Sequence, residues 1–265
     1  MDLGLKGRLA VVTGATKGIG HAIAGSLLDE GAAVLVHGRS EATVADAVDR
    51  LQGRGEVHGV AGDLSDPAAP AAIAEAVAAI GRPDVLVNNA AVYEVKSYLD
   101  LEDEDWTGSL QTNLLAGAKL AQLFLPAMLE RDWGRVVFIS SDYGVQVNPE
   151  LMPYSVAKAA VIALGRGLAV MTRGTGVTSN TVISGPTWTE GSAGFLDAAN
   201  VDSRPVEEVK AEFFEPGGFL ADTLNGRFAD PDEVAAVVAF LCSEKASVVT
   251  GAAQRADGGT IKAAH

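Results

Sequence analysis

Residues 13–20 read Thr-Gly-Ala-Thr-Lys-Gly-Ile-Gly, and this stretch decides the fold. It follows an apolar run at Arg8–Thr13, which we expect to be a buried strand. It opens the segment Gly18–Glu30, whose apolar residues recur at helical spacing. Glycines at such a turn let backbone N–H groups approach a pyrophosphate at the helix N-terminus. The spacing is G-x-x-x-G-x-G and lacks the Gly-Lys-Ser/Thr of a Walker loop. An ordinary glycine-rich turn is the alternative, but the position after a first strand favours a dinucleotide-binding turn.

The rest of the chain repeats this alternation of short apolar runs and longer amphipathic segments. Further strands are expected at Ala33–His37, Glu56–Ala61, Asp84–Asn88, Arg135–Ser140, Val177–Ile183 and Ala252–Ala256. Helices are expected after the cap residue Ser40, from Asp66-Pro67 to Ile80, at Leu101–Arg131, at Pro153–Arg173 and after Asp230. About seven apolar strands alternating with helices predict an α/β fold, a Rossmann-like doubly wound parallel sheet flanked by helices. Because the alternation continues throughout, we expect one domain spanning 1–265.

Composition excludes several classes of protein. The 265 residues carry 20 basic and 34 acidic side chains, a net charge of −14, which argues against a nucleic-acid partner and a basic membrane-surface helix. No signal-peptide pattern or 18-residue apolar stretch is evident, so we expect no membrane contact. Cys242 is the single cysteine, which excludes an internal disulfide and favours a cytoplasmic location. The four histidines show no metal-ligand spacing, so no metal site is expected.

The end of the second predicted strand indicates which dinucleotide binds. An acid at this position binds the ribose 2′-hydroxyl of NAD, whereas an arginine accommodates the 2′-phosphate of NADP. The chain has Arg39 and Ser40 here, and Glu41 already belongs to the next helix. Lys17 in the glycine turn can reach the same phosphate. Two cations and no acid favour NADP(H) over NAD(H), unless both are only solvated surface charges.

A second group of polar residues fits the transfer of a proton and a hydride. Tyr154 and Lys158 are four residues apart at the start of a predicted helix and therefore share one face. A free tyrosine, with a pKa near ~10, is a weak acid–base catalyst at neutral pH. A neighbouring ammonium favours the phenolate and lowers that pKa. Ser141 follows the fifth strand, at the edge where open α/β sheets bind ligands, and its hydroxyl can stabilise a substrate oxygen.

These motifs occur in the order typical of one enzyme family. The sequence resembles the short-chain dehydrogenase/reductase family over residues 5–260, in particular its 3-oxoacyl-[acyl-carrier-protein] reductase-like members. The resemblance rests on residues 13–20, Asn88-Asn89-Ala90, Asn113, Ser141 and Tyr154-Ser155-Val156-Ala157-Lys158. Two positions depart from the family pattern: Ala91 stands where glycine is frequent, and Ile183-Ser184-Gly185 replaces Asn-Pro-Gly.

The resemblance assigns roles to individual residues. It implies that Asn113, Ser141, Tyr154 and Lys158 are catalytic, that Asn113 helps hold a proton-relay water near the lysine, and that Lys158 also holds the nicotinamide ribose. It implies an adenine contact at Asp63. The predicted cofactor-binding residues are Gly14, Thr16, Lys17, Gly18, Ile19, Gly20, Arg39, Ser40, Asp63, Leu64, Asn89, Ala90, Tyr154, Lys158, Pro186, Thr187 and Thr189.

Residues 186–226 interrupt the alternation and carry many aromatic side chains. We expect a mobile helical substrate lid, with a short helix starting at Pro205. Its large apolar residues are Trp188, Phe195, Leu196, Phe213, Phe214, Phe219 and Leu220. The alternative is that these side chains only pack the segment onto the body of the protein.

The expected function is an NADPH-dependent reductase of a small-molecule carbonyl or alcohol. One alternative is an NAD(P)-dependent dehydrogenase of secondary alcohols or sugars. An alternative of another class is a catalytically silent dinucleotide sensor, which would not need Ser141, Tyr154 and Lys158. A homotetramer is also expected, because the predicted helix Tyr154–Met171 is apolar nearly all round and needs a partner. The lid or the C-terminal segment could instead cover that helix within one chain.

Overall fold

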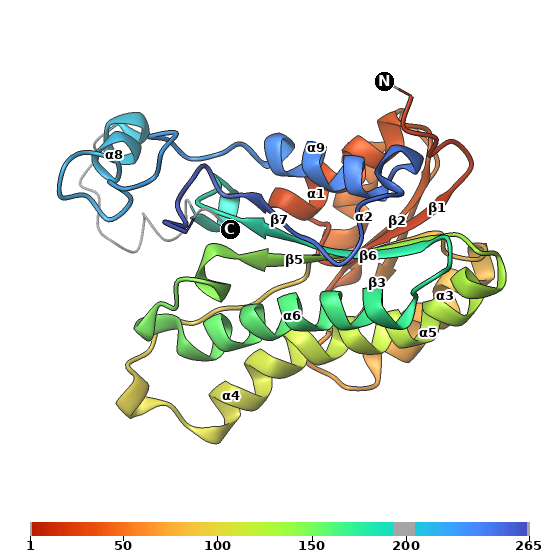
Figure 1. Ribbon diagram of the computed structural model, residues 1–265, viewed down its shortest axis with the longest axis horizontal. Helices are drawn as coiled ribbons and strands as arrows, with labels where there is room; N and C mark the ends of the chain where they lie inside the picture. Colours follow the sequence, from red (N-terminus) through yellow and green to blue (C-terminus); the bar gives the residue numbers. More distant parts are fainter. Residues whose placement is uncertain (1, 193–204, 264–265) are drawn as a thin grey trace.

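A seven-stranded parallel sheet forms the centre of the computed structural model, which describes residues 2–192 and 205–263 (Figure 1). Across the sheet the strands are β3 (Val57–Ala61), β2 (Ala33–Gly38), β1 (Leu9–Val12), β4 (Val85–Asn88), β5 (Gly134–Ser141), β6 (Val177–Ser184) and β7 (Ala253–Ala256). Each strand runs parallel to its neighbours. The chain order reverses between β1 and β4, and ligands of open α/β sheets bind beyond the carboxyl ends of the strands at such a reversal.

Helices cover both faces of the sheet, as Figure 1 shows. One face carries α1 (Gly18–Asp29), α2 (Glu41–Leu51) and α9 (Pro231–Cys242). The other carries α3 (Ala69–Ile80), α5 (Ala116–Glu130) and α6 (Met152–Met171). Two further helices, α4 (Asp103–Leu110) and α8 (Val206–Glu212), lie toward the end of the molecule that the carboxyl ends of the strands face. The predicted doubly wound α/β fold is confirmed.

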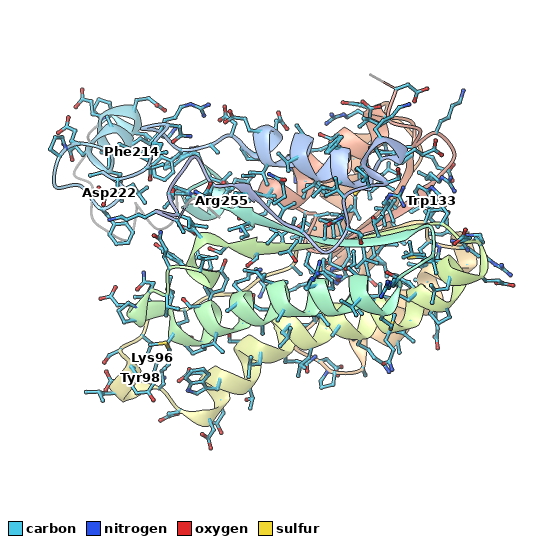
Figure 2. All side chains as sticks on the ribbon, in the orientation of Figure 1. Lys96, Tyr98, Trp133, Phe214, Asp222 and Arg255 are labelled. Atoms are coloured by element: carbon cyan, nitrogen blue, oxygen red, sulfur yellow. The ribbon has the colours of Figure 1, made fainter. Side chains whose placement is uncertain are left out.

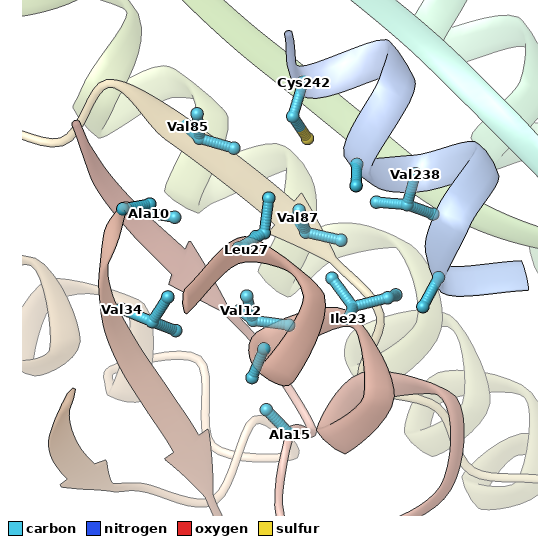
Figure 3. Close-up of a cluster of buried hydrophobic side chains, with 14 of the residues drawn as sticks. Ala10, Val12, Ala15, Ile23, Leu27, Val34, Val85, Val87, Val238 and Cys242 are labelled. Atoms are coloured by element: carbon cyan, nitrogen blue, oxygen red, sulfur yellow. The ribbon is translucent and has the colours of Figure 1, made fainter. Parts of the chain in front are cut away.

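Each helical layer packs on its own apolar core. Figure 3 shows one core, in which valines of β1, β2 and β4 meet Ile23 and Leu27 of α1 and Val238 of α9. The core on the other face joins β1, β4 and β5 to α3, α5 and α6 through side chains such as Leu86, Leu120 and Phe138. Cys242 is fully buried in the first core, and burial raises the pKa of its thiol to about 12. This cysteine is therefore a packing residue.

Two helix boundaries differ from the sequence prediction. Helix α3 begins at Ala69, although we expected Asp66-Pro67 to open it. Asp66 caps a turn instead, since its Oδ1 accepts the Ala68 N–H at 2.8 Å, and Pro70 takes the first helical turn. The long helix expected at Leu101–Arg131 is divided into α4, a π-turn at Gln111–Leu115 and α5. The capping box predicted after Asp230 is confirmed.

Short 3₁₀ turns complete the described structure. They are η1 (Tyr98–Asp100), η3 (Asp142–Gly144), η4 (Pro149–Leu151) and η5 (Glu244–Ala246). Turn η4 and helix α6 together form one helical stretch, Pro149–Met171, which is long and apolar enough by length and composition to cross a membrane. Helix α6 packs on β5 and β6, with Lys158 on its buried side. Its position is that of a helix covering a sheet.

Candidate active site

The glycine turn between β1 and α1 has a shape that only glycine fits. Gly14 and Gly18 adopt φ angles of +62° and +55°, a region that side chains disfavour. A Cβ atom on Gly20 would lie 2.3 Å from the carbonyl oxygen of Gly14 and 2.4 Å from Nδ2 of Asn89. The turn is thus closely packed against Asn89 and has no room for a side chain at Gly20.

Residues from neighbouring strands hold this turn in place. Asn89 Nδ2 donates to the carbonyl oxygens of Thr13 and Gly14, both at 3.0 Å. The Thr13 hydroxyl accepts the N–H groups of Asn89 and Ala90. The Gly14 N–H donates to Nδ1 of His37, whose Nε2 lies 2.8 Å from the Gly62 carbonyl oxygen. Burial lowers the pKa of His37, so the ring stays neutral and bridges β1, β2 and β3.

The first turn of α1 begins inside the glycine turn, at Gly18, and supplies backbone N–H donors there. Lys17 occupies the N-cap position, and its side chain makes no capping hydrogen bond. The N–H groups of the first helical turn have no partner inside a helix, and with the helix dipole they favour a phosphate. Ile19 packs its side chain on the core and leaves its backbone at the turn. The residues present therefore fit the diphosphate of a dinucleotide.

Arg39 directly follows β2, where the adenosine ribose of a dinucleotide would lie, Lys17 stands in the glycine turn, and Arg50 of α2 contacts that turn. Lys17 and Arg39 are exposed, and Arg50 Nη2 donates to the Thr16 carbonyl oxygen at 2.6 Å. Arg50 was not among the predicted site residues. Hydrogen bonds from Ser65 lower the pKa of Asp63, and the positive charge of Arg39 nearby lowers it further. This carboxylate at the end of β3 is therefore ionised.

The remaining predicted residues of this region have structural contacts of their own. Ser40 caps α2, with its Oγ accepting the Thr43 N–H at 3.4 Å. Leu64 is buried in the core below α3, and its carbonyl oxygen accepts a hydrogen bond from Gln111. Both are adjacent to predicted contact residues, Arg39 and Asp63, so they fix the backbone on which those side chains stand.

The predicted catalytic residues meet at the junction of β5 and α6. Lys158 Nζ lies 5.5 Å from the centre of the Tyr154 ring, and the Tyr154 side chain lies beside Ser141. Nζ of Lys158 also donates to the Ile139 carbonyl oxygen at 2.7 Å. Burial lowers the pKa of Lys158 to about 8 and raises the pKa of Tyr154 above its usual value of 10. Strand β5 extends through Ser141, one residue beyond the predicted end.

Asp142 is a neighbour of this group that sequence reasoning missed. Ser141 Oγ donates to Asp142 Oδ1 at 2.8 Å and accepts the Tyr143 N–H at 3.2 Å. Burial raises the pKa of the Asp142 carboxyl group. The one sequence signal was an acidic residue directly after a buried strand.

Asn113 lies in the π-turn that separates α4 from α5. Its Nδ2 donates to the carbonyl oxygens of Val92 and Ser109, both at 2.9 Å, and its Oδ1 accepts the Val92 N–H at 3.1 Å. The amide therefore fixes the segment after β4 beside the catalytic group. Single π-turns within helices often occur at functional sites.

The segment after β6 passes the glycine turn. A Cβ atom on Gly18 would lie 3.2 Å from Thr189 Cγ2, so Thr189 borders the turn. Thr187 Oγ1 donates to the Gly185 carbonyl oxygen at 3.0 Å, and the Pro186 carbonyl oxygen accepts the Ala229 N–H. The structure thus brings this predicted segment to the glycine turn.

The aromatic residues expected in the lid are only partly gathered. Trp188, Phe213 and Phe214 surround Phe228, with ring centres 5.3, 5.8 and 5.0 Å from it. Phe219 is exposed, whereas Phe195 and Leu196 lie outside the described residues. Figure 2 shows Phe214 and Asp222 at the projecting end of the molecule, while Lys96 and Tyr98 lie at the same end on the other side of the sheet. These aromatic residues therefore pack around Phe228, which lies two residues beyond the predicted lid.

Tyr93 extends from the segment after β4 to the catalytic group. Its ring meets that of Tyr154 edge-on, with ring centres 5.8 Å apart. Tyr93 is also half exposed. This side chain forms a wall beside the predicted proton donor and was not predicted from the sequence.

Comparisons with known proteins agree with this geometry. A family model described as enoyl-(acyl carrier protein) reductase matches residues 14–260. The chain is 43% identical over 266 residues to the oxidoreductase YvrD of Bacillus subtilis (strain 168), covering 99% of both chains. It is 32% identical to the 3-oxoacyl-[acyl-carrier-protein] reductase FabG of Salmonella typhimurium, covering 97% of this chain and 98% of that protein. The crystal structure of L-sorbose reductase from Gluconobacter frateurii, complexed with NADPH and L-sorbose, superimposes with a TM-score of 0.93 at 29% identity, covering 99% of this chain and 100% of that one.

The fold, the glycine turn and these similarities define an oxidoreductase with a Rossmann-like sheet. The chain belongs to the short-chain dehydrogenase/reductase family. The resemblance inferred from the sequence motifs is confirmed.

Proposed function

We propose that this protein is an NADPH-dependent carbonyl reductase in which Tyr154 gives the proton to the substrate oxygen. One observation carries the proposal: Tyr154, Lys158 and Ser141 meet at the carboxyl end of β5, on the sheet edge that also carries the glycine turn. When bound, the reduced nicotinamide supplies the hydride for the carbonyl carbon. The same site run in reverse oxidises a secondary alcohol.

Each catalytic side chain has a distinct task in this proposal. Tyr154 donates its hydroxyl proton to the oxygen that becomes an alcohol, and Ser141 contacts that same oxygen. Lys158 lies beside the Tyr154 ring, where its ammonium form favours the phenolate that remains after proton transfer. Its second proposed task is to hold the nicotinamide ribose. Asn113 fixes the neighbouring segment through Val92 and helps hold the water that resupplies the proton.

The preference for NADP(H) rests on the charges around the end of β2. Lys17 and Arg39 can together balance a 2′-phosphate of about −1.5 to −2 charge, whereas Arg50 is already paired with Asp46, Nε to Oδ2 at 3.1 Å. L-sorbose reductase, which shares this fold, has been crystallised with NADPH. Equilibrium titration of NADPH and NADH, followed by quenching of protein fluorescence, tests the preference. Equal affinities for the two cofactors would overturn it.

The remaining predicted contacts follow from the same position of the cofactor. We propose that Gly14, Gly18 and Gly20 admit the diphosphate, Asp63 contacts the adenine, and Asn89 and Ala90 line the cleft. Pro186, Thr187 and Thr189 meet the nicotinamide half. Residues 186–192 and 205–226 contribute to the substrate lid of a single domain, in which α8 buries Val209 and lies next to the aromatic group around Phe228; residues 193–204 of the predicted lid lie outside the described residues.

We also propose a cytoplasmic homotetramer built on the outer faces of α5 and α6. Exposed apolar side chains line these helices and the π-turn before them: Leu115, Leu123, Val156, Val170 and Met171. Two-fold pairing buries such a stripe twice. Light scattering on the purified protein tests the state, with a Val170→Asp, Met171→Asp double variant expected to dissociate and a Val248→Asp variant as a control on another surface. A monomeric mass for the unmodified protein would contradict the proposal.

Turnover tests the reductase proposal directly. NADPH absorbance at 340 nm is followed with a panel of ketones: ethyl acetoacetate, sorbose and diacetyl. Reduction of at least one ketone is expected, and the corresponding alcohols with NADP⁺ test the dehydrogenase alternative. Tight NADPH binding without turnover in either direction would support the sensor alternative instead.

A further inference from the structure

The hydroxyl group of Ser141 has no proton left for a substrate carbonyl. A serine hydroxyl carries one proton and two acceptor lone pairs. Ser141 Oγ gives its proton to Asp142 Oδ1 at 2.8 Å. It accepts from the Tyr143 N–H at 3.2 Å, which leaves one acceptor lone pair. A ketone oxygen can only accept, so this arrangement offers it no proton from Ser141.

Asp142 is placed to control that proton. The residue is 7% exposed and begins the turn η3, directly after β5. The charged and titratable groups that face its carboxyl are Asp257, Tyr143 and Tyr154. Asp257 follows β7 and is itself paired with Arg255, Nη2 to Oδ2 at 2.9 Å. Asp142 has no cation partner among these groups, so the carboxylate form is held mainly by Ser141 and by backbone N–H groups.

We propose that Asp142 is a positioning residue that decides whether Ser141 presents a proton or a lone pair to the substrate oxygen. Ionised Asp142 accepts the Ser141 proton, which leaves one lone pair of Ser141 free to accept from the substrate. Protonated Asp142 donates its own proton to Ser141 Oγ, which frees the Ser141 proton for the substrate. The proton that Asp142 takes up comes from solvent, and no covalent bond changes.

The two states suit opposite directions of the reaction. A ketone oxygen accepts two donors, Tyr154 and Ser141, only when Asp142 is protonated. An alcohol carries a proton of its own, so it can donate to Ser141 when Asp142 is ionised. Burial and Asp257 both raise the pKa of Asp142, which moves its titration above the usual value for aspartate, ~3.9. Ketone reduction is therefore favoured on the acidic side of this titration. The inference rests on the contact between Ser141 and the substrate oxygen proposed above.

The experiment compares pH profiles of the unmodified protein and five variants, the last two being Asp142→Leu and Asp142→Glu. The quantity measured is kcat/KM for ketone reduction at saturating NADPH between pH 4.5 and 8, using the fastest ketone of the panel above. The first four proteins are the unmodified chain, Asp142→Asn, Ser141→Ala and the double variant. Asp142→Asn keeps the side-chain shape but cannot ionise. Asp142→Leu, which can neither accept nor donate, guards against a new contact from the amide. Unfolding temperature and NADPH affinity are recorded for each protein.

The unmodified protein should lose activity as pH rises through the Asp142 titration, by about ten-fold or more, as expected for a hydrogen bond to a charged group. Asp142→Asn and Asp142→Leu should lack this fall, with unchanged NADPH affinity, whereas Asp142→Glu should restore it. In the double variant, Asp142→Asn should change the pH profile no further than Ser141→Ala alone does.

Three results would overturn the inference: a flat profile for the unmodified protein, a profile of Asp142→Asn that matches it, or an effect that persists without Ser141. Failure of the underlying proposal looks different. If Ser141→Ala alone reduces ketones as fast as the unmodified protein, Ser141 does not contact the reacting oxygen. If no ketone is reduced, the reaction on which the inference depends is absent.

Discussion

Replacing Lys158 with methionine should change how protein stability depends on pH. Lys158 is 2% exposed, and its ammonium donates to the Ile139 carbonyl oxygen. Burial lowers its pKa from 10.5 to about 8 in the folded, cofactor-free protein. Between these two pH values the unfolded chain binds a proton that the folded chain has released. The free energy of unfolding therefore rises with pH across this window.

The size of this rise follows from the two pKa values. At 1.36 kcal/mol for each pH unit, the window from about 8 to 10.5 corresponds to about 3 kcal/mol as an upper limit. Below pH 8 both states hold the proton and the contribution is constant. Tyr154 opposes the rise above about pH 10, because its raised pKa keeps the folded state protonated where the unfolded state is not. The clearest signal lies between pH 8 and 10.

Urea unfolding at pH 7, 8, 9 and 10 measures the effect. The unmodified protein should gain stability over this range relative to Lys158→Met, which has no proton to lose. At pH 7 the variant should be at least as stable, since it no longer buries an ammonium, while its turnover is lost. Lys6→Met, on an exposed lysine outside the proposed tetramer interface, is the matched control and should follow the unmodified protein. Parallel curves for the unmodified protein and Lys158→Met would refute the buried-lysine reasoning.

Three further substitutions test other parts of the site. Gly20→Ala places a Cβ atom 2.3 Å from the Gly14 carbonyl oxygen and should cost about 1–3 kcal/mol of stability and weaken NADPH binding. Gly108→Ala, whose Cβ would meet nothing within 4 Å on α4, should do neither, and calorimetry with NADPH titration compares the two variants. Arg39→Asp should weaken NADPH binding far more than NADH binding; an equal loss for both cofactors would refute the 2′-phosphate assignment. Shortening the lid at 213–220 should raise KM for the ketone more than Kd for NADPH, and the reverse order would place this segment in the cofactor site.

Much of the fold was predictable because buried parallel strands are apolar throughout. Six strand-to-helix alternations and the glycine turn locate β1 to β6 within a residue or two of their observed ends. The spacing of Tyr154 and Lys158 on one helix, with Ser141 after β5, predicts residues that the structure brings together.

Two local features of the helices could not be predicted from the sequence: the start of α3 and the π-turn before α5. Asp66-Pro67 and Pro70 are both suitable helix starts, and hydrogen bonding within the turn decides between them. The π-turn at Gln111–Leu115 leaves the apolar spacing of α5 intact, so periodicity cannot reveal it.

The missed site residues depend on contacts between distant segments. His37 joins three strands through Gly14 and Gly62, which no local pattern encodes. Phe228 gathers the lid aromatics from outside the predicted lid. Asp142 could not be assigned to the site from the sequence, because its contact with the Ser141 hydroxyl is visible only in the structure.

The central claim is that Tyr154 is the proton donor of a ketone reductase, and Tyr154→Phe tests it most directly. The variant removes the hydroxyl and keeps the ring that meets Tyr93. Single-turnover reduction by preformed enzyme–NADPH complex is measured by stopped flow, with Tyr98→Phe, on an exposed tyrosine, as the control. We predict a fall of at least ~100-fold for Tyr154→Phe, with NADPH affinity retained and the control unaffected. A rate for Tyr154→Phe close to that of the unmodified protein would contradict the account.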